Sequence, residues 1–368
     1  MKTSEIKKRK ATATEERRLS ANAFVVAPGV WRLKDIFVNV FIIQDLDSPD
    51  WVLVDAGLKT TGARLKKLVA ELFGSAGSLP KAIVLTHAHF DHRGSLEELA
   101  TEWGVPVYCH HQELPYLQGR ASYPPTDPSV GGGMMATLSF VYPKKPINFT
   151  GDLQELPQDG SIPPLQDWRW IHTPGHTPGH ISLFRDADGV LIAGDAITTT
   201  LAESALSTAT QAKILSGPPK YFTPDWGAAA RSVRELAQLK PAVIATGHGQ
   251  TLYGPTQAQA LNHLARTFWQ KGMPAKGRYV KEPAQFDEEG VVTYVPPARG
   301  YFAARLITAA ALLTIGYLLY RKGRKGNFLE RKASEKLGKT LMSGSLQALG
   351  ASAPAVPALP ALPVIPAL

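Results

Sequence analysis

Cysteine is almost absent from this chain of 368 residues, which contains only Cys109. A single cysteine excludes an intramolecular disulfide and a zinc site built from several thiolates. Any metal site must therefore use histidine and carboxylate side chains. Apolar residues make up 44% of the sequence, so the chain can bury a full hydrophobic core, and we expect one globular domain with appended segments.

The body of the chain lacks a net positive charge, although the whole sequence carries +9. Residues 1–20 contribute +4 and residues 301–368 contribute +7, which leaves −2 for residues 21–300. A basic protein would ordinarily suggest nucleic acid or an anionic membrane as a partner. Because the basic residues gather in the terminal segments, we expect a small-molecule substrate and no nucleic acid for the body. No pattern indicates an oligomeric state.

An apolar segment that resembles the core of a secretion signal is missing before Phe24. We therefore expect the catalytic body to be cytoplasmic. Residues 1–22 are rich in charged side chains, and burial of such a segment releases too little free energy to offset its ordering entropy. We expect a disordered basic tail there.

Short runs of β-branched and aromatic residues alternate with helical patterns between residues 23 and 270. Residues 36–43 and 51–54 predict a β-hairpin, apolar residues spaced from Leu65 to Phe73 predict an amphipathic helix, and residues 82–85 predict a buried strand. The second half repeats the alternation, with strands expected at 181–184, 190–193 and 242–245 and a helix at 228–239. This order predicts a layered α/β domain.

Two stretches depart from this alternation. Residues 118–164 are rich in Pro, Gly and Ser and include three consecutive glycines at 131–133, which predicts a lid or binding loop. Residues 271–300 are expected to be a linker. The lid segment also contains Met134, Met135, Phe140 and Tyr142, which would suit an apolar substrate or would pack the lid onto the core.

In the C-terminal region, the 15 residues from Leu306 to Tyr320 contain no charged side chain, and a basic cluster follows them directly. Residues 302–320 would form about 28 Å of helix. We expect a hydrophobic helix with a basic flank at 301–325 that associates with a membrane through residues 302–320. A buried core helix is the alternative, since a spanning helix usually needs about 20 apolar residues. Residues 326–368 are expected to be a basic, then Pro/Ala-rich, disordered tail.

Three histidines and an aspartate lie within six positions directly after the strand expected at 82–85: His87, His89, Asp91 and His92. In a loop that leaves a strand, side chains at this spacing can converge on one small volume. Imidazole together with carboxylate suits zinc or iron better than calcium. The segment therefore predicts a metal site.

This segment resembles the HxHxDH motif of the metallo-β-lactamase superfamily, and four further pieces of the chain agree with that family in order. They are Asp55 at the end of Trp-Val-Leu-Val, His176 in His-Thr-Pro-Gly-His-Thr-Pro-Gly-His, Asp195 in Leu-Ile-Ala-Gly-Asp, and His248 in Ala-Thr-Gly-His-Gly. The resemblance implies a four-layered αββα metallo-β-lactamase sandwich for residues 23–270, followed by the C-terminal hydrophobic helix.

The same resemblance implies the roles of the individual residues. One metal would be bound by His87, His89 and His176, a second by Asp91, His92 and His248, and both by a bridging Asp195. The expected cofactor is two zinc ions per chain, with iron or manganese as alternatives. Asp91 is also expected to orient the attacking water or carry its proton, while Asp55 and His180 would support the ligands through hydrogen bonds.

The activity implied by the resemblance is metal-dependent hydrolysis by a hydroxide held between the two metals, whose binding lowers the pKa of water. We expect an ester, lactone, thioester or related carbonyl substrate. Tyr221 could donate a hydrogen bond to the developing oxyanion, and a packing role is equally compatible with its position. Two alternatives stay open: a mononuclear iron-dependent oxygenase of the same fold and a non-catalytic, membrane-tethered binding protein.

Overall fold

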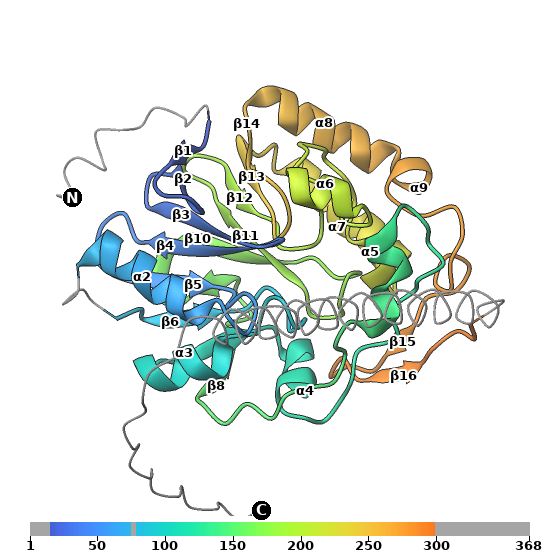
Figure 1. Ribbon diagram of the computed structural model, residues 1–368, viewed down its shortest axis with the longest axis horizontal. Helices are drawn as coiled ribbons and strands as arrows, with labels where there is room; N and C mark the ends of the chain where they lie inside the picture. Colours follow the sequence, from blue (N-terminus) through green and yellow to red (C-terminus); the bar gives the residue numbers. More distant parts are fainter. Residues whose placement is uncertain (1–14, 75–78, 299–368) are drawn as a thin grey trace, which may run out of the picture. The chain divides into compact units, whose positions relative to one another are not determined.

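Two β-sheets pack face to face in the computed structural model, which describes residues 15–74 and 79–298. Helices α2 (Gly62–Phe73) and α3 (Leu96–Trp103) cover the outer face of the first sheet. Helices α7 (Trp226–Gln238) and α8 (Pro255–Arg266) cover the outer face of the second (Figure 1). The predicted αββα order of four layers is therefore confirmed for the described part of the chain.

The first sheet contains eight strands in sequence order. They are β1 (Arg17–Arg18), β2 (Ala23–Ala27), β3 (Val30–Asp35), β4 (Val38–Gln44), β5 (Trp51–Val54), β6 (Ala82–Val84), β7 (Val107–Cys109) and β8 (Leu153–Glu155). Strands β1 to β5 pair antiparallel, and β5 to β8 pair parallel. The parallel pairs bring the ends of β5 and β6 to the same edge of the sheet.

The second sheet contains six strands in the order β14-β13-β12-β11-β10-β9. They are β9 (Ser161–Ile162), β10 (Leu165–His172), β11 (Ile181–Arg185), β12 (Val190–Ile192), β13 (Val243–Ala245) and β14 (Leu252–Tyr253). Only β12 and β13 pair parallel within this sheet. Their carboxyl ends consequently lie next to each other.

Amphipathic spacing explains how the outer helices attach. Helix α2 buries Leu65 and Leu68 against the first sheet, and α7 buries Val233 and Leu236 against the second. Helix α7 begins where the side chain of Asp225 accepts a hydrogen bond from the backbone N–H of Ala228 (2.9 Å), which satisfies one of the free donors of the first turn. The helices expected near residues 65–73 and 228–239 are thus confirmed.

Shorter helical elements lie in the connections. They are the α-helices α4 (Leu114–Leu117), α5 (Met134–Thr137), α6 (Ala205–Thr210) and α9 (Phe268–Lys271), and the 3₁₀ turns η1 (His111–Glu113), η2 (Ser139–Val141) and η3 (Lys220–Phe222). The segment expected to be a lid, residues 118–164, contains α5 and η2. Met135 and Tyr142 of this segment pack against Tyr221 and Phe222, beside the metal site described below.

The segment expected to be a linker contains a hairpin instead of a plain connection. Strands β15 (Gln285–Phe286) and β16 (Val292–Tyr294) pair antiparallel. The phenol of Tyr116 donates a hydrogen bond to the carbonyl oxygen of Gly290 in the hairpin turn, 174 positions away. Contacts of this kind join residues far apart in sequence, so composition alone did not indicate them.

The expected terminal segments lie largely outside the described residues. Residues 15–22 of the N-terminal segment are described, and there Glu16 forms an ion pair with the buried guanidinium of Arg32 (2.7 Å). Residues 1–14 lie outside the description. So do the hydrophobic helix expected at 301–325, its membrane-associating residues 302–320 and the tail at 326–368. Among the described residues, no helix is long and apolar enough to cross a membrane.

Candidate metal centre

All seven predicted ligands meet at one edge of the two sheets because each follows the end of a strand or the turn beyond it. The loop from His87 to His92 follows β6, His176 lies in the turn between β10 and β11, Asp195 follows β12, and His248 follows β13. Parallel pairing of β12 with β13 places the last two side by side. The ligand atoms of the seven residues form three buried groups, and within each group these atoms lie within 4.8 Å of one another. The groups are His87/His89/His176, His87/His92/Asp195 and Asp91/His92/His248.

The first group consists of three imidazoles, His87, His89 and His176. Nδ1 of His89 lies 2.9 Å from Nε2 of His176, and the buried Nε2 of His87 has no hydrogen-bond partner. In a tetrahedral site with zinc–nitrogen bonds of about 2.1 Å, ligand atoms lie about 3.4 Å apart. Three buried nitrogens lie close enough together to bind one divalent cation, and one of them has no hydrogen-bond partner.

The second group adds carboxylate, since Nε2 of His248 lies 3.5 Å from Oδ2 of Asp91. Asp195 lies between the two groups. Its Oδ2 is 3.5 Å from Nε2 of His176 and 3.0 Å from Nε2 of His248, while its Oδ1 is 3.6 Å from Nε2 of His92. One carboxylate therefore reaches histidines of both groups.

A hydrogen-bond chain fixes the tautomer of His87. The hydroxyl of Thr86 has one proton, which it donates to the carboxylate of Asp55 at about 3 Å, so its oxygen accepts from Nδ1–H of His87 (3.0 Å). Nε2 of His87 therefore keeps its lone pair and faces the other ligands. Asp55 has a positive φ of 63°, a conformation that is uncommon for a residue other than glycine. Such local strain is typical of functional sites.

Outer hydrogen bonds orient the second group in the same way. Nδ1 of His92 donates to Oδ2 of Asp55 (2.8 Å), and Nδ1 of His248 donates to the carbonyl oxygen of Phe37 (2.8 Å). Both imidazoles thus direct Nε2 toward the metal site. His180 differs, because its Nε2 accepts the backbone N–H of Asp195 (2.8 Å). That lone pair is used, so His180 holds the aspartate and is not itself free to bind a metal.

Burial controls the protonation of the first group. It lowers the pKa of His87 and His89 well below the ordinary histidine value and lowers the pKa of His176 to about 3. Repulsion from the protonated imidazole of His92 lowers the pKa of His87 and His89 further. All three side chains are therefore neutral near pH 7, which is the form that binds metals.

Carboxylates reverse this effect in the second group. Burial by itself would lower the pKa of His92 and His248, but Asp195 and Asp91 outweigh it and raise both, with a further contribution from Asp55 at His92. Burial would raise the pKa of Asp195, yet the same two histidines hold it well below its usual range. This half of the site is a network of opposite charges.

Aromatic side chains close the space above the ligands, leaving a cavity of about 20 Å³. Its lining residues, besides His89, Asp91, Asp195 and His248, are Phe37, Phe90, Met135, Tyr142, Pro219, Tyr221 and Phe222. The sequence had suggested Tyr221 and an apolar lid but not Phe37, Phe90 or Phe222. Phe90 lies inside the HxHxDH segment, so its position beside the ligands was the one available signal.

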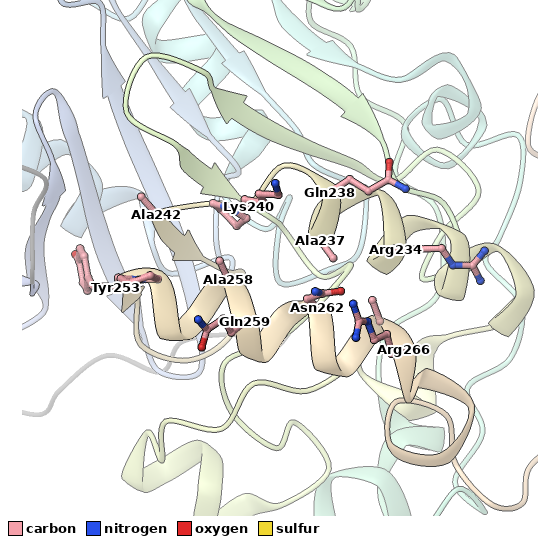
Figure 2. Close-up of a pocket in the computed structure, with 14 residues that line it drawn as sticks. Arg234, Ala237, Gln238, Lys240, Ala242, Tyr253, Ala258, Gln259, Asn262 and Arg266 are labelled. Carbon is pink, nitrogen blue, oxygen red and sulfur yellow. The ribbon is translucent and has the colours of Figure 1, made fainter.

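A much larger hollow of about 940 Å³ lies between α7 and α8 (Figure 2). Arg234, Lys240, Asn262 and Arg266 contribute to its wall, together with alanine and proline side chains. No His, Cys, Asp or Glu is among its lining residues. The chemistry therefore belongs to the small cavity at the sheet edge and not to this larger hollow.

An αββα fold that gathers buried histidines and aspartates at one sheet edge is typical of metal-dependent hydrolases. The family model described as "Metallo-beta-lactamase superfamily" matches residues 33–248, and the chain belongs to this family. The fold and its His/Asp groups imply a divalent metal centre.

Two named bacterial proteins are similar to the chain in sequence, and one solved structure resembles it more distantly. The chain is 44% identical over 247 residues to "Probable metallo-hydrolase YflN" of Bacillus subtilis, covering 67% of this chain and 93% of that protein. It is 27% identical to "Probable metallo-hydrolase YybB" of the same organism, covering 58% and 82%. The solved BLEG-1 B3 metallo-β-lactamase is similar at 23% identity with a TM-score of 0.43, covering 60% of this chain and 91% of that one.

Proposed function

We propose that this protein hydrolyses a small ester, lactone, thioester or related carbonyl compound with two metal ions, most simply zinc. The ligands would be His87, His89 and His176 for one metal, Asp91, His92 and His248 for the other, and Asp195 for both. The position of Asp195 carries the proposal, because its Oδ2 approaches histidines of both groups within 3.5 Å. A shared carboxylate reduces the repulsion between two neighbouring dications.

Two bound metals would supply a hydroxide nucleophile near neutral pH and polarise the carbonyl oxygen. The chain's own part is to place acceptors for the proton. Asp91 is buried beside the cavity, and burial raises the pKa of its carboxyl, although His92 and His248 oppose that effect. The position of Asp91 beside the cavity supports a role for its carboxylate in orienting water and moving its proton.

The cavity wall supports a substrate with an uncharged, apolar portion. Phe37, Phe90, Tyr142, Tyr221 and Phe222 line it, and no lysine or arginine does. A free carboxylate on the substrate would find no cationic partner there except the metals. The phenol of Tyr221 is 3.5 Å from the carbonyl oxygen of Ala202, at the limit of a hydrogen bond, so it could turn to the substrate oxyanion instead.

The complete second group supports two metals over a mononuclear oxygenase. His92 and His248 both point Nε2 toward Asp91 and Asp195, and none of the seven positions is occupied by a side chain unable to bind metal. The same completeness opposes a non-catalytic binding protein, since vestigial sites lose ligands.

Metal analysis combined with an activity screen tests the proposal. The purified chain should contain two divalent metals and hydrolyse at least one substrate in a panel of aryl esters, lactones, thioesters, β-lactams and phosphodiesters. Apolar acyl substrates should have higher kcat/KM than their carboxylated analogues. One iron per chain with oxygen consumption, or no bound metal and no turnover, would contradict the proposed function.

The sequence of residues 302–320 supports a further proposal, that this segment tethers the enzyme to a membrane with the catalytic domain on the cytoplasmic side. The full chain should then sediment with membranes and resist a high-salt wash. A chain that ends near Pro297 should stay in the supernatant and keep its activity. Full-length protein in the supernatant after salt-free lysis would contradict the tether.

A further inference from the structure

Glu113 is a fully buried carboxylate that lies close to the metal centre without touching a ligand side chain. It ends the turn η1, its exposed fraction is 0%, and it makes no ion pair with another described residue. A buried carboxylate without an ion pair costs free energy unless hydrogen bonds and nearby positive charge compensate for it. Its surroundings show where that compensation comes from.

Four donors surround the carboxylate, two on each oxygen. Oε2 accepts hydrogen bonds from the backbone N–H of Ala88 (2.9 Å) and from the phenol of Tyr123. Oε1 accepts from the hydroxyl of Thr177 (2.7 Å) and from the backbone N–H of Gly179 (3.0 Å). A carboxylate has about four acceptor sites, so its hydrogen-bonding capacity is filled.

The two oxygens serve two different ligand loops. Ala88 lies between His87 and His89, so Oε2 holds the peptide that separates two ligands of the first group. Thr177 follows His176 directly, so Oε1 holds the loop that supplies the third ligand. The carboxylate of Glu113 therefore links the two segments on which the first group depends.

Neighbouring residues contact Glu113 or the loops that it links and hold them in position. The ring of Tyr123 lies 4.4 Å from the ring of His89, so the same phenol that binds Glu113 also supports a ligand. The guanidinium of Arg93 donates to the carbonyl oxygen of Ala88 (2.6 Å), so both the backbone N–H and the carbonyl group of Ala88 are held in place. A Cβ atom at Gly179 would lie 2.9 Å from Cγ and from the backbone N of Glu113, so the close approach requires glycine.

We propose that Glu113 is a positioning residue that fastens the His87–His89 loop to the His176 loop and so fixes the three imidazoles as one preformed site. The inference rests on the proposed ligand assignment. The negative charge of the Glu113 carboxylate would also be compensated by a divalent ion bound to the first group. The second group contacts Glu113 through none of these hydrogen bonds, so its affinity for metal should be independent of the carboxylate.

Stepwise titration of the metal-free protein with cobalt(II) and zinc tests this proposal without any substrate. We compare Glu113→Gln and Glu113→Ala with Asp45→Asn. Asp45 is a buried carboxylate that accepts backbone N–H groups of Asp47 and Ser48 in the turn between β4 and β5. Glu113→Gln keeps the shape of the side chain but presents an NH₂ group to donors, so it remains informative if Glu113→Ala unfolds.

The expected result is selective. First-site affinity should fall roughly 10-fold in Glu113→Gln and up to roughly 100-fold in Glu113→Ala, the range for loss of an outer partner of a metal ligand. Second-site affinity should stay within about twofold, and the visible bands of cobalt in the first site should shift. Asp45→Asn should change neither metal affinity nor the cobalt spectrum.

Unchanged first-site affinity and an unchanged cobalt spectrum in both Glu113 variants, with only a lower unfolding temperature, would overturn the positioning role while leaving the ligand assignment intact. If the wild-type chain instead bound no metal through the first group, the ligand assignment would fail and the positioning role with it. The two failures are thus distinguished by the behaviour of the wild-type protein alone.

Discussion

The two halves of the metal centre both contain buried histidines, but the electrostatic environments of these histidines are opposite. His87, His89 and His176 are held neutral, because burial lowers their pKa values. His92 and His248 have raised pKa values, because Asp195 and Asp91 outweigh burial. The first half is therefore ready to bind a metal, whereas the second half must first release protons.

This difference has a structural origin in the outer hydrogen bonds. Nδ1 of His87 donates to the neutral hydroxyl of Thr86, while Nδ1 of His92 donates to the carboxylate of Asp55. A carboxylate partner makes an imidazole a stronger base and a stronger metal ligand than a hydroxyl partner does. We therefore expect metal affinity in the first half to depend mainly on the geometry of the ligands, and metal affinity in the second half to depend mainly on charge.

Loss of a ligand from the first half should have the largest effect. His176→Ala removes a nitrogen that we propose as a metal ligand and that no described neighbour replaces, because Nε2 of His180 is already bonded to the backbone of Asp195. We expect one metal to be lost and kcat/KM to fall by far more than the roughly 10- to 100-fold cost of losing an outer partner. Metal analysis and steady-state kinetics measure both.

A matched control for that variant is His263→Ala, which removes an exposed imidazole of α8 whose Nε2 lies 2.9 Å from Nζ of Lys271, away from the metal centre. It should keep both metals and normal turnover. Two metals per chain in His176→Ala would show that the three imidazoles do not act together.

Asp91→Asn should have the next largest effect, and it separates rate from first-site occupancy. The amide fills the same space but neither accepts a proton as a base nor binds the second metal as an anion. We expect kcat to fall roughly 10²- to 10⁴-fold, the usual contribution of a general base, while the first site stays occupied. Rapid-quench or steady-state assays at saturating zinc measure this. Wild-type turnover in this variant would exclude Asp91 from proton handling.

The contrast between local and distant contacts also decides what the sequence could predict. Each of the seven predicted ligands belongs to a short motif, as in Thr86-His87 after β6 or Gly194-Asp195 after β12, so the resemblance of these motifs to the family was enough to predict that they share one site. The alternation of strands and helices predicted a layered α/β domain, and the resemblance to the metallo-β-lactamase superfamily implied its αββα order. These predictions needed no knowledge of distant contacts.

Residues whose role depends on distant contacts were missed. Glu113 lies 25 positions after Ala88 and 66 positions before Gly179, and its own segment contains no metal motif. The hairpin of β15 and β16 was likewise expected to be a linker, since its anchor is the hydrogen bond from Tyr116 to Gly290. Only the folded chain shows which polar residues are buried together.

Asp55→Asn should weaken the second half without disturbing the first half's ligand atoms. Asparagine has the same shape, but its amide is a weaker acceptor for Nδ1–H of His92 and for Thr86. We expect second-metal affinity to fall roughly 10- to 100-fold, with a smaller change at the first metal through Thr86 and His87. Zinc titration against a competing chelator measures both affinities. Equal losses at the two sites would show that Asp55 acts on the loop as a whole.

The most diagnostic effect should be a difference in pH dependence between the two metals. Imidazoles with raised pKa values are still protonated when their metal arrives, so binding must displace protons, and affinity must fall as pH falls. Each displaced proton changes the affinity about tenfold per pH unit below the raised pKa. His92 and His248 therefore predict a steep slope for the second metal between pH 6 and 8. The first group has lowered pKa values, is already neutral in that range, and predicts a nearly flat slope.

Titrations at pH 6, 7 and 8 with calorimetry in two buffers of different ionisation enthalpy measure the slopes and the protons released. Equal slopes at both sites would mean that the two halves share one charge network and that the contrast drawn from their hydrogen bonds is wrong.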